Sequence, residues 1–432
     1  MFTIVGADSP DLAFSARKII LGAMNLGGSQ SFPAETTSKG QFPVTMAACI
    51  GLIVFGTSPI LFACSPAPTR SFFHEYPGWQ ILGRVFLAII IAMAVLVTGR
   101  LDPEKGAAKV IRYCGFILLA ALLTDLHFFT VDVFNLRWQL DQYNGILNHT
   151  CLPPDQYRFL PQGTLWWMIL CNGDFVFSYL AYRFFFTFLV CQSIYTFARL
   201  YLTPRDAVIV VLFYAAFYPM STRYYFGNLL DPMSHAVMLA ALTCCHRRQL
   251  GQVFWLMVLG MFIKETMLLI IPCYYLMNSE TFRWRDSRIF WHLALLAVAG
   301  LGVFLACRIP FHFNYDFQTL NRTTELMVYG NLGFARATAQ STVSVFQRYL
   351  HPMLFIFMWL PLIVWRRKML PRSLFRTALY LAAAFYLANL CFGWNYESRN
   401  FVPALIFLLV CTMLIVNRLI EARPSGAGGA ES

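Results

Sequence analysis

Long apolar runs separated by short polar segments fill the chain from residue 43 onward. About 20 apolar residues in a helix cross the hydrocarbon core of a bilayer, so each long run predicts a transmembrane helix. Single crossings are predicted near 43–63, 79–99, 110–127, 176–198, 207–222, 230–245, 290–307, 350–365, 374–391 and 401–416. The pattern predicts an all-α, polytopic integral membrane protein with about 10 to 12 transmembrane helices.

The run Gly251–Leu276 differs from the others because Lys264 and Glu265 stand in its middle. One charge at the centre of a spanning helix costs about 2.5–3.5 kcal/mol, so this pair is not expected to face lipid. Basic residues near span ends collect on the cytoplasmic side. Here they flank both ends of the run: Arg247 and Arg248 before it, and Arg283, Arg285 and Arg288 after it. We therefore expect two short helices, 252–263 and 266–278, that meet at the pair on the opposite face; one long tilted helix is the alternative.

Charge and polarity also divide the rest of the chain. Residues 1–42 are polar and lack the early apolar core of a signal peptide, so they are predicted to be a cytoplasmic segment. Residues 43–418 form the predicted helical domain, followed by a Gly- and Ala-rich, disordered cytoplasmic tail, 419–432. The polar segments 128–163 and 308–349 are predicted external loops. Both termini are then cytoplasmic.

Composition excludes a soluble globule and several classes of function. Of 432 residues, 58% are hydrophobic and 12% are charged. The net charge of +12 comes from basic residues spread over short loops, which is typical of membrane topology and not of nucleic-acid binding. The 12 cysteines lie mostly within apolar runs, and neither a Walker-type glycine loop nor a metal-ligand spacing is present. No cofactor is predicted, and the sequence leaves open whether a divalent metal assists.

The predicted topology places the unusual polar residues on one side of the membrane, facing a periplasm or a lumen. They are Asp132, Asp141, Arg158, Arg223, Asp231, Lys264, Glu265, Glu397 and Arg399, with His235 as a structural neighbour. Carboxylates mixed with fixed cations suit a phosphate-bearing ligand, because Arg binds phosphate through two hydrogen bonds and Lys acts as a point charge. Apolar helices beside such a site would suit a lipid tail.

Three segments resemble motifs of the GT-C superfamily of polytopic membrane glycosyltransferases. They are Tyr157-Arg158-Phe-Leu-Pro161, Phe262-Ile-Lys264-Glu265-Thr (preceded by Gly227-Asn-Leu-Leu-Asp231-Pro), and Tyr396-Glu397-Ser-Arg399-Asn-Phe-Val-Pro403. The resemblance extends over residues 125–418. It implies an inverting transfer of a sugar from a polyprenyl-phosphate donor to an acceptor on the external face, in a bacterial inner (cell) membrane. Two extra spans precede the region, and the first loop lacks the adjacent acidic pair of many members.

The resemblance also implies roles for single residues. Asp141, in Trp138-Gln-Leu-Asp141-Gln-Tyr143, or Asp132 would be the base that takes the proton of the acceptor hydroxyl. Arg158, Lys264 and Arg399 would contact phosphate, Glu265 and Glu397 would orient them, and Arg223 and Asp231 would complete the substrate site. The partners implied are the lipid-linked donor and membrane lipids. Two alternatives remain open: a transporter or flippase for a lipid-linked or anionic substrate, and an inactive GT-C-like assembly partner.

Overall fold

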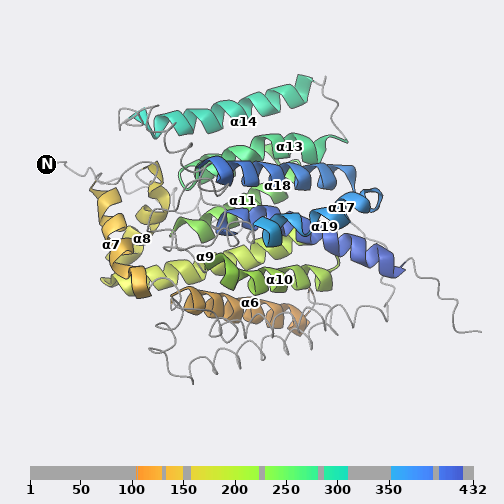
Figure 1. The fold of residues 1–432 in the computed structure, drawn as a ribbon. Helices are drawn as coiled ribbons and strands as arrows, with labels where there is room; N and C mark the ends of the chain where they lie inside the picture. Colours follow the sequence, from red (N-terminus) through yellow and green to blue (C-terminus); the bar gives the residue numbers. More distant parts are fainter. Residues whose placement is uncertain are drawn as a thin grey trace, which may run out of the picture. The chain divides into compact units, whose positions relative to one another are not determined.

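The structure, a computed structural model, describes residues 104, 106–128, 133–148, 157–222, 229–280, 287–309, 352–392 and 398–421. Within these ranges the regular elements are helices, and no strand is present (Figure 1). All of these residues fall in one unit of the chain, Phe42–Ser432. The predicted crossings near 43–63 and 79–99 lie outside the described residues, as do segment 1–42, nearly all of loop 308–349 and most of tail 419–432.

The described helices are α6 (Gly106–His127), α7 (Val133–Leu147), α8 (Phe159–Asn172), α9 (Phe175–Ala198), α10 (Pro204–Thr222), α11 (Leu230–His246), α12 (Leu250–Met261), α13 (Ile270–Asn278), α14 (Ser287–Ala306), α17 (Leu360–Trp365), α18 (Arg372–Phe392) and α19 (Val402–Glu421). Short 3₁₀ turns occupy Glu265–Leu269, Arg367–Met369 and Ser398–Phe401, and a π turn occupies Met353–Phe357. The predicted all-α class is thus confirmed for this part of the chain.

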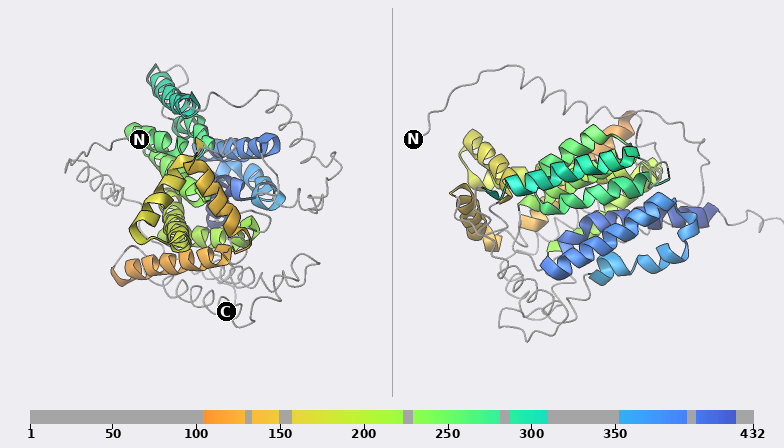
Figure 2. Two further views of the ribbon diagram at one scale, coloured as in Figure 1. Left: turned by 90° about the vertical axis from the view of Figure 1, so that its left-hand side faces the viewer. Right: turned by 90° about the horizontal axis from the view of Figure 1, so that it is seen from above.

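Five helical segments are long and apolar enough to cross a membrane among the residues described: Ala108–His127, Phe175–Ala198, Ser287–Ala306, Arg372–Cys391 and Arg399–Glu421. The chain is therefore an α-helical membrane protein by length and composition, while the count of 10 to 12 crossings stays a prediction. The segment Arg399–Glu421, which contains α19, is the most buried of the five. Of its most apolar stretch 61% is buried, against 17% for the segment that forms α14. Figure 1 shows α14 at the edge of the helical layer, and the right panel of Figure 2 shows the same helices from above.

Part of the predicted external loop 128–163 is helical instead of irregular. Gln139, Gln142, Tyr143 and Ile146 recur at helical spacing and are all buried, so they form the inner face of α7. Polar side chains on that inner face interrupt the apolar pattern, so the apolar runs of the sequence do not reveal this helix. Helices α7 and α8 lie together at one end of the described helices (Figure 1), and the left panel of Figure 2 views that end.

Side-chain contacts define the opposite end, which we call the Arg248 end. At this end the start of α6 contacts the end of α9, the start of α10 contacts the end of α19, and the start of α18 contacts the end of α13. Consecutive long helices therefore alternate in direction. The contacts are Arg199 Nε to Glu104 Oε1 (2.8 Å), Asn417 Nδ2 to Asp206 Oδ2 (2.8 Å), and Ser373 N to Glu280 Oε1 (3.0 Å). Partial burial raises the pKa of Glu104, but hydrogen bonds from Arg199 and Tyr195, with the charges of Arg199 and Arg112, together hold that pKa below its usual value.

Helices α12 and α13 form a hairpin that enters and leaves at the Arg248 end. Asn278, the last residue of α13, accepts a hydrogen bond from Arg248 Nε (3.2 Å) and donates one to the Cys245 carbonyl (3.0 Å). Between the helices, Lys264 is extended, with φ −160° and ψ 136°. With 12 residues, α12 is about 18 Å long, well short of a bilayer core of about 30 Å. The prediction of two short helices is confirmed, and the single long helix is excluded.

Two glycines of α14, Gly300 and Gly302, test how closely this helix packs against the hairpin. A Cβ added to Gly300 would lie 2.8 Å from Leu268 Cδ2, whereas one added to Gly302 would meet nothing within 4 Å. We expect Gly300→Ala to destabilise the protein by about 1 kcal/mol or more through overpacking. Gly302→Ala should be neutral or stabilising by up to about 1 kcal/mol through helix propensity. Thermal unfolding in detergent measures both, and equal shifts for the two variants would show that the contact between α14 and the hairpin is not tight.

Candidate functional site

The other end of the described helices, which we call the Asp231 end, contains a buried ionic cluster. Asp231 Oδ1 accepts a hydrogen bond from Lys264 Nζ at 3.2 Å, and its Oδ2 accepts one from Arg399 Nη1 at 2.7 Å. The three side chains are only 7%, 13% and 15% exposed, respectively. Three different elements position them: the first turn of α11, the break between α12 and α13, and the 3₁₀ turn that precedes α19. An acidic residue also suits the positive end of a helix dipole.

Glu265 forms the second half of the cluster with two arginines. Its Oε2 accepts from Arg158 Nη2 at 2.9 Å and Nε at 3.2 Å, and its Oε1 accepts from Arg308 Nη2 at 3.2 Å. The guanidinium of Arg308 lies over the rings of Tyr157, at 4.4 Å, and Phe304, at 3.5 Å. Arg158 directly precedes α8, whose Leu160 N–H donates to the Phe262 carbonyl at 3.3 Å. Helix α8 is thereby joined to the α12–α13 break.

The two halves are one cluster, because Lys264 and Glu265 are adjacent in the chain. Lys264 Nζ also donates to Asn400 Oδ1 at 2.8 Å, and Asn400 Nδ2 donates to Asn389 Oδ1 at 2.8 Å. Among the described residues, the cluster brings four cations together with two carboxylates. Arginine and lysine at such spacing suit a phosphate group.

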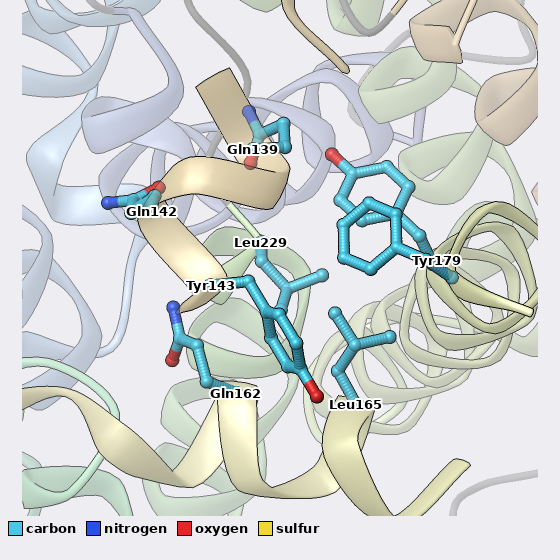
Figure 3. Close-up of a pocket in the computed structure, with 8 residues that line it drawn as sticks. Gln139, Gln142, Tyr143, Gln162, Leu165, Tyr179 and Leu229 are labelled. Carbon is cyan, nitrogen blue, oxygen red and sulfur yellow. The ribbon is translucent and has the colours of Figure 1, made fainter. Parts of the chain in front are cut away.

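A small cavity lies between α7, α8 and α9 at the same end (Figure 3). Its interior has room for about one water molecule. Its lining is uncharged and consists of Gln139, Gln142, Tyr143, Gln162, Leu165, Phe175, Tyr179 and Leu229. The chain connects the cavity to the cluster, because Leu229 stands two residues before Asp231 and Gln162 stands four residues after Arg158.

The structure brings together five of the residues predicted for the site: Arg158, Asp231, Lys264, Glu265 and Arg399. They lie at one end of the helices, where the predicted topology also places them, while the side of the membrane stays a prediction. Asp132, Arg223 and Glu397 lie outside the described residues.

Asp141 stands apart from the cluster. It is exposed on α7, on the face opposite Gln139 and Tyr143, and the described residues form no ion pair between it and the cluster. The prediction of an Asp in a loop is therefore wrong for Asp141, which is helical. Its role as a base remains a prediction.

Sequence reasoning missed Arg308 and the asparagines of the cluster. Arg308 follows the apolar run 290–307 and begins the predicted loop 308–349, so its position at the external end of a span was a usable signal. Asn389 and Asn400 offered no comparable signal, because uncharged amides near helix ends are common in membrane proteins. No group of three or more His, Cys, Asp or Glu side chains able to hold a metal ion occurs in the part of the chain that the structure describes.

Comparison of the chain with models of protein families, with curated proteins and with solved structures finds no match. The likeness to GT-C glycosyltransferases therefore rests on the short sequence motifs around Arg158, Lys264 and Arg399 alone.

Proposed function

We propose that this protein is a membrane glycosyltransferase that moves a sugar, with inversion, from a polyprenyl-phosphate donor to an acceptor on the external face. The single observation that carries the proposal is the buried cluster of three arginines and one lysine with two carboxylates, at the break of the α12–α13 hairpin. Arginine and lysine side chains of this kind suit the phosphate of a lipid-linked donor. The GT-C-like motifs around the same residues supply the reaction class, and a bacterial inner membrane is the proposed location.

In the proposed reaction the cluster stabilises the leaving group. The acceptor oxygen bonds to the anomeric carbon while the bond from that carbon to the phosphate oxygen breaks, and the bonding pair leaves with the phosphate. Arg158, Lys264 and Arg399 meet the developing charge on that phosphate. Asp231 and Glu265 each accept hydrogen bonds from two cations, so they position those cations and are not suited to take a proton. We propose Asp141 or Asp132 as the base that receives the acceptor proton.

The lipid tail of the donor needs an apolar path next to the cluster. Arg308 of the cluster follows the last turn of α14, and Trp291, Val298 and Leu305 on that helix recur at every seventh residue and are all strongly exposed. Such a stripe faces hydrocarbon in a membrane protein. It supports an arrangement in which the tail lies along α14 while the phosphate reaches the cluster. Arg223 and Glu397 complete the proposed substrate contacts.

A transfer assay in proteoliposomes tests the proposal. Purified protein is supplied with a panel of radiolabelled polyprenyl-phosphate sugars and the products are separated. Wild type should transfer or hydrolyse sugar from one donor. Arg399→Gln should lower kcat/KM about 10- to 100-fold, because a hydrogen bond to a charged group contributes about 1.5–3 kcal/mol. Arg199→Gln, which removes an arginine that pairs with Glu104 at the Arg248 end, is the matched control and should leave turnover unchanged.

The alternative function is a transporter or flippase, and the break in the α12–α13 hairpin is the observation that favours it. Discontinuous helices that carry polar groups are typical of substrate sites in secondary transporters. The same proteoliposomes separate the two functions. Movement of a labelled lipid or anion across the vesicle membrane, without transfer or hydrolysis from any donor, would replace the glycosyltransferase by the transporter. An assembly partner without activity would show neither.

A further inference from the structure

Helix α8 ends where a candidate membrane span begins. Only Gly173 and Asp174 separate it from α9, which is long and apolar enough to cross a membrane. Gly173 adopts the left-handed conformation, with φ 75°, and so ends α8, while Asp174 caps α9. Helix α8 has 14 residues, or a length of about 21 Å, and Figure 1 shows it running across the direction of the long helices. It therefore lies at the end of the spans, at the level of a bilayer surface.

The two faces of α8 differ in burial and not in charge, because none of its 14 residues is charged. Its inner face contains the buried residues Pro161, Gln162 and Leu165. Its outer face exposes between 45% and 64% of each of four large apolar side chains: Phe159, Trp166, Trp167 and Leu170. Exposed apolar side chains that gather on one face mark contact with a protein or with a membrane.

Two observations favour lipid as the occupant of this outer face. Tryptophan combines an apolar ring with a polar N–H, so it concentrates at the boundary between lipid headgroups and acyl chains, and two adjacent tryptophans stand on α8. Exposed apolar side chains also continue along the chain into the span, where Phe177 and Phe185 of α9 are 62% and 52% exposed. The outer face of α8 thus adjoins a helix that is itself suited to contact lipid.

We propose that α8 is an in-plane helix that docks on the bilayer surface, with lipid covering its outer face. A helix of this kind sinks its apolar side about 5–10 Å into the boundary between headgroups and acyl chains. The lipid contact is expected for a glycosyltransferase and for a transporter alike, so a failed transfer assay would leave it standing.

Docking of α8 also sets the level of the ionic cluster relative to the membrane. Arg158 directly precedes α8 and pairs with Glu265 at the α12–α13 break. The Leu160 N–H donates to the Phe262 carbonyl at 3.3 Å, and the rings of Phe159 and Phe262 lie 5.1 Å apart. A helix held at the bilayer surface therefore holds the cluster close to the depth of lipid phosphates.

Fluorine NMR of protein that carries fluorinated tryptophan, reconstituted in lipid nanodiscs, tests the proposal on the wild-type chain. Trp166→Phe and Trp167→Phe assign the two signals, since each variant lacks one of the 10 tryptophans. The corresponding tyrosine variants, Trp166→Tyr and Trp167→Tyr, serve where a phenylalanine variant fails to fold. A nitroxide on the lipid headgroup or at the top of the acyl chain should broaden both signals more than a nitroxide at the end of the chain.

Trp291 is the control for access to lipid, because it is 68% exposed on the outward stripe of α14. Its signal, assigned with Trp291→Phe, should be broadened by lipid nitroxides whatever covers α8. Broadening of the Trp166 and Trp167 signals by a water-soluble gadolinium chelate alone would place the outer face of α8 in water. Broadening by none of the probes would show a second copy of the chain on that face, and strongest broadening from the chain end would show a helix inserted into the bilayer core. Each of these three results would overturn the proposal.

Discussion

Asp231→Asn is expected to destabilise the folded protein by about 3–5 kcal/mol, which is the usual cost of removing one partner from a buried ion pair. The substitution keeps the size of the side chain but removes the carboxylate that, among the described residues, pairs with both Lys264 and Arg399. Two largely buried cations would then lose the negative charge they share. Thermal or denaturant unfolding in detergent, followed by circular dichroism, measures the loss.

Asp141→Asn is the matched control for this experiment, because it makes the same change at an exposed position of α7. Its effect on stability should stay within about 0.5 kcal/mol. Adding Lys264→Met to Asp231→Asn should recover part of the loss, since one of the two cations is then removed as well. Equal stability of Asp231→Asn and Asp141→Asn would mean that the cluster does not hold its charges buried.

Loss of the catalytic base should have the largest effect on turnover. In the transfer assay, either Asp132→Asn or Asp141→Asn should lower kcat about 10²- to 10⁴-fold, the usual contribution of general base catalysis. The variant that lacks the base should still bind the donor, because we propose that Arg158, Lys264 and Arg399 hold its phosphate.

Asp174→Asn is the control for these two variants. Asp174 caps α9 by accepting a hydrogen bond from the Phe177 N–H, and asparagine caps a helix equally well, so turnover should not change. If neither Asp132→Asn nor Asp141→Asn lowers kcat while the wild type transfers sugar, the base lies elsewhere. Asp141 is exposed on the face of α7 opposite the cavity lining. Comparing the two variants therefore decides which aspartate, if either, is the base.

The sequence predicts the helical architecture and the charged residues at the centre of the cluster, because both depend on local patterns. Apolar runs locate the helices from α9 to α19, and the basic residues around Gly251–Leu276 predict the α12–α13 hairpin. The adjacent charges Lys264 and Glu265 are conspicuous in an apolar segment. In the structure Lys264 pairs with Asp231, and Glu265 pairs with Arg158.

Other parts of the site could not be predicted, since they depend on contacts between distant segments. Helix α7 is hidden because buried glutamines interrupt its apolar face. The pairing of Arg308 with Glu265 spans 43 residues, and neither residue signals the other. The cavity needs three helices to converge, so no single stretch of sequence indicates it.

The α12–α13 hairpin has a consequence for how the chain is inserted during synthesis. Neither half reaches the length at which a segment partitions into a bilayer by itself, and between them stands a charged pair. The hairpin must therefore enter the membrane as a unit, sheltered by helices that it contacts, among them α11 and α14. A nascent chain that ends after Met261 lacks both the returning half and α14, so biogenesis of this region depends on synthesis continuing to Ala306 before the hairpin settles.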